Sequence, residues 1–400
     1  MTKTVAIIAA LDTKSAEAGL VKRVIETQGV RSFTIDVGVL GEPGISADYT
    51  RAQVATAGNA NLSTLIQQHD KSAAMDAMTR GVAVVAQQLF AQSKIDGIIG
   101  LGGTSGTVIA SSAMRALPVG VPKILISTVA SGDTRQYVGT KDIAMLYSVV
   151  DIAGINRLSN LILTNAAAAI AGMVQVDTPE IVDRPILAAS MFGNTTACID
   201  RARGSLEQQG YEVLVFHATG AGGQTMEALI ADGFVDGVLD LTTTEWADEL
   251  IGGVFAAGPH RLDAAGAKGI PQVIAPGCLD MVNFGAPETI PPQFADRLLY
   301  KWNPGVTLMR TTPEENVQLG TILAQKASAA TGPVTIMLPI GGISQLDSEG
   351  EIFWWPEANQ ALFDAIRSNS GPNVKILELD CNINDPEFAD TASRTLLEMI

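Results

Sequence analysis

The most constraining feature of the sequence is a regular alternation between short apolar runs and longer helical patterns. Runs such as TVAIIAA (residues 4–10) and SFTID (residues 32–36) have the length of buried strands. The stretches between them, such as SAEAGLVKRVIETQG, carry apolar residues at helical spacing. This alternation predicts βαβ units, in which parallel strands form a sheet that helices cover.

The same order of elements occurs twice along the chain. IDGIIGL (residues 95–101) matches VDGVLDL (235–241), and GVPKILIST (120–128) matches GIPQVIAPG (269–277). A chain of 400 residues is also long for a single core. We therefore predict an α/β fold of two tandem Rossmann-like domains, residues 1–180 and 181–400, with mostly parallel sheets flanked by helices and a cleft between them. The boundary is expected near the proline-containing stretch VDTPEIVDRP, residues 176–185.

Charge and composition exclude several classes of protein. The formal net charge of −16 opposes a broad contact with the phosphate backbone, so no DNA partner is expected. A small nucleotide remains possible because the field of a binding site is local. The three cysteines have neither a disulfide pattern nor zinc-ligand spacing. The N-terminal apolar run is too short for a signal peptide or a membrane span, so we expect a cytoplasmic protein without a membrane partner.

A glycine-rich loop, GIIGLGGTSGT (residues 97–107), lies between a predicted strand and a predicted helix. Glycines let the backbone approach an oxyanion closely, and the start of a helix adds its dipole. The loop is not a Walker A motif, because no lysine follows its last glycine, and Ser105 stands where a GxGxxG motif has its third glycine. It is either a phosphate-binding loop or a tight turn between strand and helix.

Two other strand ends should lie beside this loop, because ligands of parallel sheets bind at the carboxyl ends of strands. These are LDTK (residues 11–14) and STVASGD (residues 127–133). Lys14 is either a counter-charge for phosphate or a solvated lysine, and Asp12 is either a helix cap or a carboxylate near a bound cation. The predicted nucleotide-binding residues are Asp12, Lys14, Gly102, Gly103, Thr104, Ser105, Gly106, Thr107, Thr128, Ser131 and Gly132.

Three further residues have two interpretations each. Asp36 ends the second strand, where Rossmann proteins place an acid that binds ribose, but no GxGxxG motif precedes it. Asp151 either faces the cleft or caps the next helix. Cys278 is either a nucleophile or a small buried residue. The sequence identifies no metal ligands.

The second half of the chain contains the candidate catalytic residues His217, Glu245 and Arg310. His217 precedes a glycine loop and a helix start, which suits an anion site with a titratable group beside it, or it is structural. Glu245 is either a general base or part of a capping box. Arg310 suits the carboxylate or phosphate of a substrate, or a buried ion pair. The residues expected to bind a substrate are Gly220, Gly222, Gly223, Thr242, Thr243 and Thr244.

Taken together, these motifs resemble the Tm-1-like ATP-binding family, also called the UPF0261 family. The resemblance covers essentially the full 400 residues and rests on LDTK, GLGGTSGT, STVASGD, VDIAGINRLSNLILTNAAAAIAGM, VFHATGAGGQTME, VLDLTTTE, GIPQVIAPGCLDMVNFG, VTLMRTT and INDPEFAD. It implies two Rossmann-like domains, dimer formation, and ATP bound in the N-terminal domain on residues 102–107 with residues 128–132 and the LDTK segment. The chain departs from the family at Trp302, where a histidine is expected before Asn-Pro, so no histidine can take part in metal binding or acid–base chemistry there.

The leading hypothesis is an ATP-dependent enzyme, a phosphotransferase or an ATP hydrolase, acting on a small anionic metabolite held between the domains. ATP with Mg²⁺ is the expected cofactor, and a homodimer or higher homo-oligomer is the expected assembly. One alternative is a nucleotide-binding sensor or interaction protein without turnover. Another is an enzyme that acts on phosphorylated sugar acids without ATP.

Overall fold

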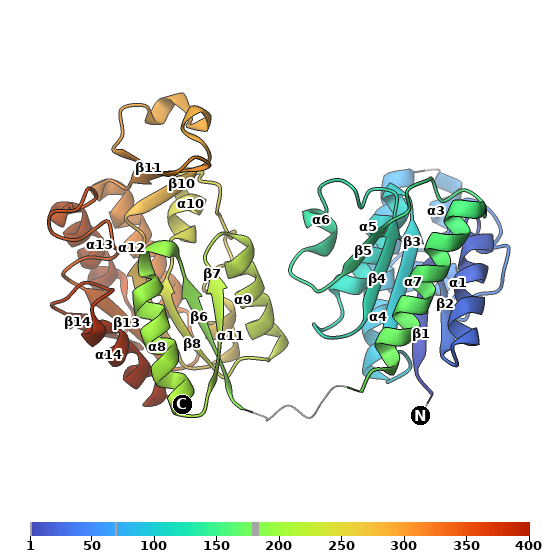
Figure 1. The fold of residues 1–400 in the computed structure, drawn as a ribbon, viewed down its shortest axis with the longest axis horizontal. Coiled ribbons are helices and arrows are strands. Elements are labelled where there is room, and N and C mark those ends of the chain that lie inside the picture. The colour runs from blue at the N-terminus through green and yellow to red at the C-terminus, as the bar shows by residue number, and fades with distance from the viewer. Residues whose placement is uncertain (1, 69, 178–183) are drawn as a thin grey trace. The chain divides into compact units, whose positions relative to one another are not determined.

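The computed structural model describes residues 2–68, 70–177 and 184–400 (Figure 1). The chain divides into two compact units, Met1–Glu180 and Ile181–Ile400. The boundary predicted within residues 176–185 falls mostly on residues 178–183, which lie outside the described residues. Each unit is an α/β layer structure built on a parallel sheet, so the prediction of two Rossmann-like domains is confirmed.

The N-terminal unit contains a five-stranded parallel sheet with the order β2-β1-β3-β4-β5. Its strands are β1 (Thr4–Ala9), β2 (Arg31–Asp36), β3 (Gly97–Gly102), β4 (Lys123–Ser127) and β5 (Ala144–Tyr147). β1 pairs with β2 on one side and with β3 on the other. The winding direction of the chain therefore reverses between β1 and β3, which makes their carboxyl ends the topological switch point of this sheet.

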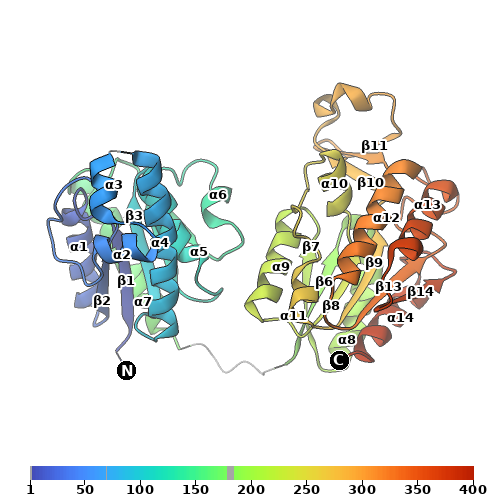
Figure 2. The same cartoon turned by 180° about the vertical axis from the view of Figure 1, so that it is seen from behind.

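Helices cover both faces of this sheet (Figures 1 and 2). One face packs against α1 (Ser15–Thr27) and α7 (Arg157–Gln175), and the other against α2 (Arg51–Ala57), α4 (Lys71–Ala91) and α5 (Thr104–Arg115). The short helices are α3 (Leu62–Gln68) and α6 (Arg135–Val138). Because side chains alternate along a strand, Val5 and Ile7 enter one core while Ala6 and Ile8 enter the other.

The C-terminal unit contains a six-stranded parallel sheet with the order β14-β13-β9-β8-β6-β7. Its strands are β6 (Ile186–Met191), β7 (Glu212–His217), β8 (Gly237–Thr242), β9 (Gln272–Gly277), β13 (Val334–Pro339) and β14 (Val374–Leu379). β6 pairs with both β7 and β8, so the winding reverses there in the same way as between β1 and β3.

Helices α8 (Thr196–Gln208) and α14 (Pro386–Leu397) cover one face of this second sheet. The other face packs against α9 (Ala221–Asp232), α11 (Ala264–Lys268), α12 (Pro313–Ser328) and α13 (Pro356–Asn369). The short elements are η1 (Gly193–Thr195), α10 (Glu245–Ile251), η2 (Pro287–Thr289) and η3 (Pro292–Phe294).

An insertion after β9 forms a small antiparallel sheet with the order β10-β12-β11. Its strands are β10 (Met281–Phe284), β11 (Leu299–Asn303) and β12 (Val306–Arg310). Alternation of βα units does not predict this hairpin, because its strands pair with near neighbours in the chain rather than through crossover helices.

Candidate functional site

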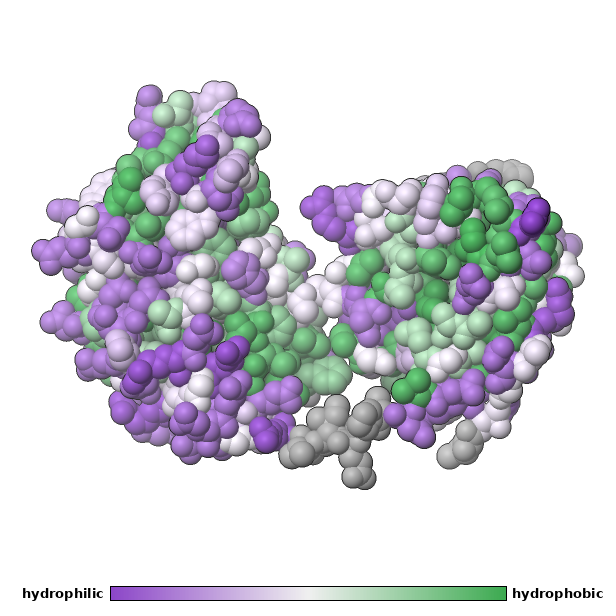
Figure 3. Space-filling view, viewed as in Figure 1, coloured by the Kyte–Doolittle hydropathy of each residue, from purple (hydrophilic) through white to green (hydrophobic). Residues whose placement is uncertain are grey.

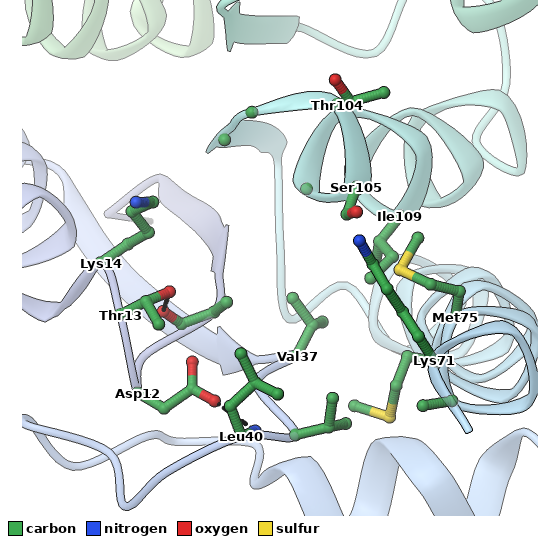
Figure 4. Close-up of a pocket in the computed structure, with 18 of the residues that line it drawn as sticks. Asp12, Thr13, Lys14, Val37, Leu40, Lys71, Met75, Thr104, Ser105 and Ile109 are labelled. Carbon is green, nitrogen blue, oxygen red and sulfur yellow. Dashed lines mark hydrogen bonds between the residues drawn. The ribbon is translucent and has the colours of Figure 1, made fainter. Parts of the chain in front are cut away.

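A pocket of about 620 Å³ lies at the carboxyl edge of the N-terminal sheet (Figure 4). Its walls come from the segments that follow β1 (residues 10–14), β2 (37–40) and β3 (101–106), with α3 and α4 on one side. This is the switch point between β1 and β3, where open parallel sheets bind their ligands. The volume is in the range of pockets for small molecules and cofactors.

The start of α5 forms one wall of this pocket through residues 102–106. Gly103 is the N-cap residue and makes no side-chain capping bond. Thr107 donates the first backbone bond of the helix, of 2.8 Å, to the carbonyl of Gly103. The amide groups of Thr104, Ser105 and Gly106 therefore have no acceptor within the helix and can bind an anion.

Gly102 allows the end of β3 to lie close against the start of α5. A Cβ atom at Gly102 would lie 2.8 Å from the Cα of Gly106, which is too close for any other residue type. A Cβ atom at Gly103, in contrast, would meet only the hydroxyl of Thr128, at 3.8 Å. Gly102 is thus needed for the shape of the loop, while Gly103 leaves open space beside the pocket.

Two lysines line the pocket from different elements. Lys14 follows β1, and Lys71 is the first residue of α4. Figure 4 shows the Lys71 side chain extending from α4 toward Ser105 at the start of α5. Neither lysine has an ion-pair partner among residues 2–68, 70–177 and 184–400. No local sequence pattern connects Lys71, at the start of α4, with the glycine loop, so this lysine was not among the predicted residues.

Asp12 holds the segment after β2 against the end of β1. Its Oδ2 atom accepts hydrogen bonds from the amides of Leu40 (2.7 Å) and Gly41 (3.1 Å). Its Oδ1 atom is buried and has no hydrogen-bond partner in the described residues. Asp12 does not cap α1, whose N-cap residue is Lys14. Of the two roles considered for Asp12, capping is therefore not observed.

Asp36 is closed off from the pocket. It is 1% exposed, and its Oδ1 atom accepts 2.9 Å bonds from the amides of Leu11 and Gly38. Burial, and more weakly the negative charge of Asp12, raises the pKa of Asp36. Asp36 therefore joins the segments that follow β1 and β2 through these hydrogen bonds, and it is too buried to bind a ribose.

The remaining wall of the pocket combines apolar side chains with carboxylates. The apolar part consists of Val37, Val39, Leu40, Leu65, Ile66, Met75, Met78 and Ile109. Asp70 caps α4 by accepting a bond from the amide of Ala73. Asp151 also lines the pocket, and it does not cap α7, because Asn156 has that role. Within the described part of the chain, Asp151 accepts no hydrogen bond.

Four residues predicted to bind nucleotide are not part of the pocket wall, namely Thr107, Thr128, Ser131 and Gly132. Thr107 is fully buried and its hydroxyl bonds to the hydroxyl of Ser127 at 2.7 Å. The Thr128 amide bonds to the carbonyl of Gly102 at 3.4 Å. Residues 127 and 128 therefore hold the glycine loop in place by hydrogen bonds and do not line the pocket. The structure brings Asp12, Lys14 and residues 102–106 together around the pocket, as expected.

The glycine loop of the C-terminal unit binds a side chain of the chain itself. The Oε1 atom of Glu245 accepts bonds from the amides of Gly220 (2.7 Å) and Gly223 (3.0 Å) at the start of α9. A Cβ atom at Gly222 would overlap the carbonyl of His217, so this glycine permits close packing. Of the three glycines expected to bind a substrate here, Gly220 and Gly223 therefore donate their amide groups to Glu245.

Glu245 belongs to a buried ionic cluster centred on Arg261, which is 1% exposed. The Arg261 guanidinium bonds to Glu245 (2.6 Å), Asp240 (2.7 Å) and Glu227 (3.2 Å). Burial raises the pKa of Glu245 and that of Glu227, while Arg261 opposes this shift. Although burial alone would lower the pKa of Arg261, its carboxylate partners raise it. The sequence contained no signal for Arg261, because its three partners come from separate segments.

The predicted substrate residues Thr242, Thr243 and Thr244 are all fully buried. The hydroxyl of Thr242 bonds to that of Thr195 at 2.8 Å, and Thr243 donates to the carbonyl of Ala275 at 3.1 Å. The hydroxyl of Thr244 donates to the carbonyl of Met281 at 3.5 Å, so all three hydroxyls have partners within the C-terminal unit. They present no free group to a ligand in this structure.

Arg310 forms a second buried cluster. It donates to the carbonyl of Phe353 (2.8 Å), to Asn359 (2.9 Å) and to Asp347 (3.3 Å). The structure therefore shows the buried ion pair, one of the two roles considered for Arg310. Nearby Asp280 is fully buried, and burial together with the charge of Asp347 raises its pKa to about 7.

The last two candidates in the C-terminal unit differ in exposure. Burial raises the pKa of the Cys278 thiol, and this cysteine is 0% exposed, which agrees with a small buried residue rather than a nucleophile. His217 is exposed at the end of β7, where its ring stacks on Phe192 at a centroid distance of 5.3 Å. Among the described residues, no group of three His, Cys, Asp or Glu side chains is arranged to hold a metal ion.

Comparison with known proteins gives matches over both units. The N-terminal domain model of the uncharacterised protein family UPF0261 matches residues 3–179, and its C-terminal domain model matches residues 184–400. A UPF0261 protein of Clostridium tetani is 50% identical over the whole of both chains. A ToMV resistance protein Tm-1 of tomato, Solanum lycopersicum, is 45% identical over 77% of this chain, which corresponds to 42% of the tomato protein.

Solved structures resemble the chain only distantly. A UDP-N-acetylglucosamine 2-epimerase aligns with 93% of this chain and 92% of its own, at 10% identity and a TM-score of 0.26. A likeness at this level carries no inference about activity.

Proposed function

The chain belongs to the UPF0261 family, and we propose that it is an ATP-binding protein whose nucleotide occupies the pocket of the N-terminal unit. The observation that carries this proposal is the start of α5. There, the unpaired amide groups of residues 104–106 line a pocket of about 620 Å³ at the switch point between β1 and β3. A helix N-terminus at this place in a parallel sheet is suited to phosphate groups.

The charges around the loop suit a polyphosphate better than a single carboxylate. Lys14 and Lys71 line the pocket from two sides, and both are free of carboxylate partners within the described ranges. Two cations together with the helix dipole offset most of the charge of a triphosphate. Lys14 and Lys71 would therefore contact the phosphates, as the lysine of a Walker A motif does in other loops.

The apolar wall suits the base of the nucleotide. Val37 and Leu40 form one side of the pocket, while Met75 and Ile109 form another (Figure 4), and Met78 also lines it. Methionine side chains adapt to flat aromatic surfaces and make favourable sulfur–ring contacts. An adenine ring would lie among these side chains, with its phosphates toward α5.

The pocket also fits a magnesium ion bound together with the phosphates. Mg²⁺ in nucleotide sites is held by the phosphates, by water and by one or two carboxylates. Asp151 lines the pocket and its oxygens accept no hydrogen bond from the described part of the chain. Asp151 is the carboxylate that we assign to the ion, which would neutralise phosphate charge during transfer.

For the reaction, we propose transfer or hydrolysis of the terminal phosphoryl group, with a small anionic metabolite as the acceptor. A second candidate function is a nucleotide sensor without turnover. It is favoured by the burial of Glu245 and Arg310, which are engaged in internal ion pairs and do not contact solvent.

Thermal unfolding of the full chain tests nucleotide binding. ATP with Mg²⁺ at 100 times its dissociation constant should stabilise the N-terminal unit by about 2.7 kcal/mol, which raises its midpoint by about 5–10 °C. Gly103→Val should abolish this shift, because the new side chain enters the space beside the amide groups. Gly204→Ala is the matched control, since a Cβ atom there meets no atom within 4 Å.

The same screen separates the alternatives. A shift with 6-phosphogluconate but none with ATP would contradict the proposal and favour an enzyme of phosphorylated sugar acids. Where ATP does bind, release of inorganic phosphate measured with a panel of small carboxylic acids distinguishes an enzyme from a sensor.

A further inference from the structure

The pocket of the N-terminal unit contains a serine hydroxyl that the fold does not use. Ser105 is the second residue of α5 and lines the pocket. Its hydroxyl makes no hydrogen bond with residues 2–68, 70–177 or 184–400. The hydroxyl of Thr107, in contrast, is bound to that of Ser127 at 2.7 Å and holds the loop in place. The Ser105 hydroxyl is therefore free to react with a ligand in the pocket.

The Ser105 side chain points into the pocket, and that of its neighbour Thr104 does not. Figure 4 shows the Ser105 hydroxyl directed toward the amino group of Lys71 and the Thr104 side chain directed away from it. Successive residues of an α-helix are rotated by about 100° around its axis, which accounts for this difference. Of the two side-chain hydroxyls at the start of α5, that of Ser105 faces the space for the ligand.

The groups around Ser105 suit the charge of a phosphoryl group in transfer. The backbone amides of residues 104–106 have no acceptor within α5, and Lys71 has no ion-pair partner in the described ranges. Catalysis of phosphoryl transfer depends mainly on positioning and on stabilising the charge of the phosphoryl oxygens. The pocket therefore provides an acceptor hydroxyl, donors for the phosphoryl oxygens and a cation.

The residues of the C-terminal unit that were expected to act on an acceptor are engaged in internal contacts. Glu245 and Arg310 are each 1% exposed and form buried ion pairs. The hydroxyls of residues 242–244 are bonded within that unit. An acceptor inside the nucleotide pocket therefore accounts for phosphoryl transfer better than these residues do.

Solvent reaches the part of the pocket where Ser105 lies. The pocket is at the carboxyl edge of the sheet, and its lining includes the exposed residues Leu40 and Thr104. Figure 3 shows hydrophilic side chains beside apolar ones along this edge, which is the top of the N-terminal unit in that view. A hydroxyl at this place can release its proton to water when it reacts.

We propose that Ser105 accepts the terminal phosphoryl group of ATP and becomes a phosphoserine, an inference that rests on the proposed binding of ATP in this pocket. The Oγ atom of Ser105 forms a bond to the terminal phosphorus, the bond from this phosphorus to the β-phosphate oxygen breaks, and ADP leaves with the electron pair. The hydroxyl proton passes to water. Lys71 and the amides of residues 104–106 stabilise the charge on the transferred group. A hydroxyl of the small anionic metabolite, or water, then attacks the phosphorus and Ser105 recovers a proton.

The first test measures the mass of the full chain, 41.8 kDa, after incubation with ATP and Mg²⁺ and an acid quench. One phosphoryl group should add about 80 Da, and the tryptic peptide of residues 95–115 should carry it. Ser105→Ala should gain no mass, although ATP should still raise its unfolding temperature. Ser72→Ala, which removes an exposed serine outside the pocket lining, should be modified like the wild type.

The second test detects a phosphoserine that is too short-lived to accumulate. The wild type should exchange label between ADP and ATP in the absence of any metabolite, and Ser105→Ala should not. At saturating ATP, Lys71→Ala should slow this exchange by at least about 100-fold, and Lys71→Arg, which keeps the charge, should slow it less.

Two outcomes would overturn the phosphoserine and leave ATP binding in place. One is a wild type that binds ATP but neither gains mass nor catalyses exchange. The other is a Ser105→Ala variant that is still modified. A wild type whose unfolding temperature does not respond to ATP would overturn both this inference and the proposed function.

Discussion

The carboxylate of Glu245 accepts a 2.7 Å hydrogen bond from the amide of Gly220, at the start of α9. The glycine loop of the C-terminal unit therefore binds a carboxylate of the chain itself. The equivalent amide groups at the start of α5 have no such partner in the described residues. The two units therefore carry the same kind of loop, one filled by a side chain and one facing a pocket.

Lys71 should contribute to nucleotide binding without contributing to folding. We expect Lys71→Ala to weaken ATP binding about tenfold, which is the lower end of the range for a charge-assisted hydrogen bond, because the side chain is exposed. Isothermal titration calorimetry with ATP and Mg²⁺ measures this. Lys22→Ala, which removes a lysine of α1 paired with Glu26, should bind ATP like the wild type. An unchanged affinity in Lys71→Ala would place the phosphates elsewhere.

Arg261 should be the most important single charge for the stability of the C-terminal unit. Arg261→Met leaves Asp240, Glu245 and Glu227 buried without their counter-charge, and breaking a buried pair costs about 3–5 kcal/mol of the free energy of unfolding. Urea unfolding at pH 8 should show this loss. Arg201→Met, which removes an exposed pair with Asp390, should cost less than about 1 kcal/mol.

The loss of stability in Arg261→Met should depend on pH. Burial raises the pKa of Glu245 and of Glu227 and Arg261 opposes this, so without Arg261 the folded state holds protons on these two carboxylates more tightly than the unfolded state does. The loss of stability in Arg261→Met should therefore be smaller at pH 5 than at pH 8. An equal loss at both pH values would show that the carboxylates are not the source of the effect.

Asp248 should make the wild-type chain less stable as the pH rises. Burial raises the pKa of Asp248 to about 7, from an ordinary value of 3.8. Because the folded pKa lies above the unfolded one, its contribution to stability is complete below about pH 4 and is lost as the pH rises to about 7. Asp248→Asn should flatten this part of the profile, measured by urea unfolding from pH 4 to 8.

An asparagine at position 248 can keep the bond that Asp248 Oδ1 accepts from the Asn283 backbone amide at 2.8 Å. Asp248 now accepts from the Asn283 side-chain amide at 2.6 Å, and the Oδ1 atom of Asn283 has no partner in the described residues. Rotation of the Asn283 amide would present Oδ1 to the new donor. We expect Asp248→Asn to be more stable than the wild type by about 1–3 kcal/mol at pH 8. A profile as steep as that of the wild type would assign the pH dependence to Asp280 instead, whose pKa is also raised to about 7.

Gly38 should be required for the shape of the pocket. A Cβ atom at this position would lie 2.6 Å from the carboxyl carbon of Asp12, which the amides of Leu40 and Gly41 hold in place. Gly38→Ala should cost about 1–3 kcal/mol and weaken ATP binding, as seen by thermal unfolding with and without nucleotide. Gly19→Ala, inside α1 and without a close contact, should be neutral or stabilising by up to about 1 kcal/mol.

The sequence predicted the glycine loop and the LDTK segment of the pocket, and it assigned substrate binding to the corresponding loop of the other unit, where Glu245 binds two of the amide groups. Gly102 and Gly103 could be recognised because a glycine run between a strand and a helix predicts a tight or anion-binding loop from neighbouring residues alone. Lys71 could not, because it lies on a helix far along the chain that happens to pack beside this loop. Gly220 and Gly223 have the same local pattern as the first loop, and only Glu245, bound from α10, distinguishes them.

The sequence by itself determined the two parallel sheets, since strand length, helical spacing and glycine turns are properties of short segments. It also determined that a helix would begin with free amide groups after β3 and after β7. Only the tertiary structure decided which of these sites faces a pocket. The free amide groups at a helix start bind an anion that lies close to them. Long-range packing decides whether that anion is a side chain of the chain itself, such as Glu245 at α9, or a ligand in a pocket, as proposed at α5.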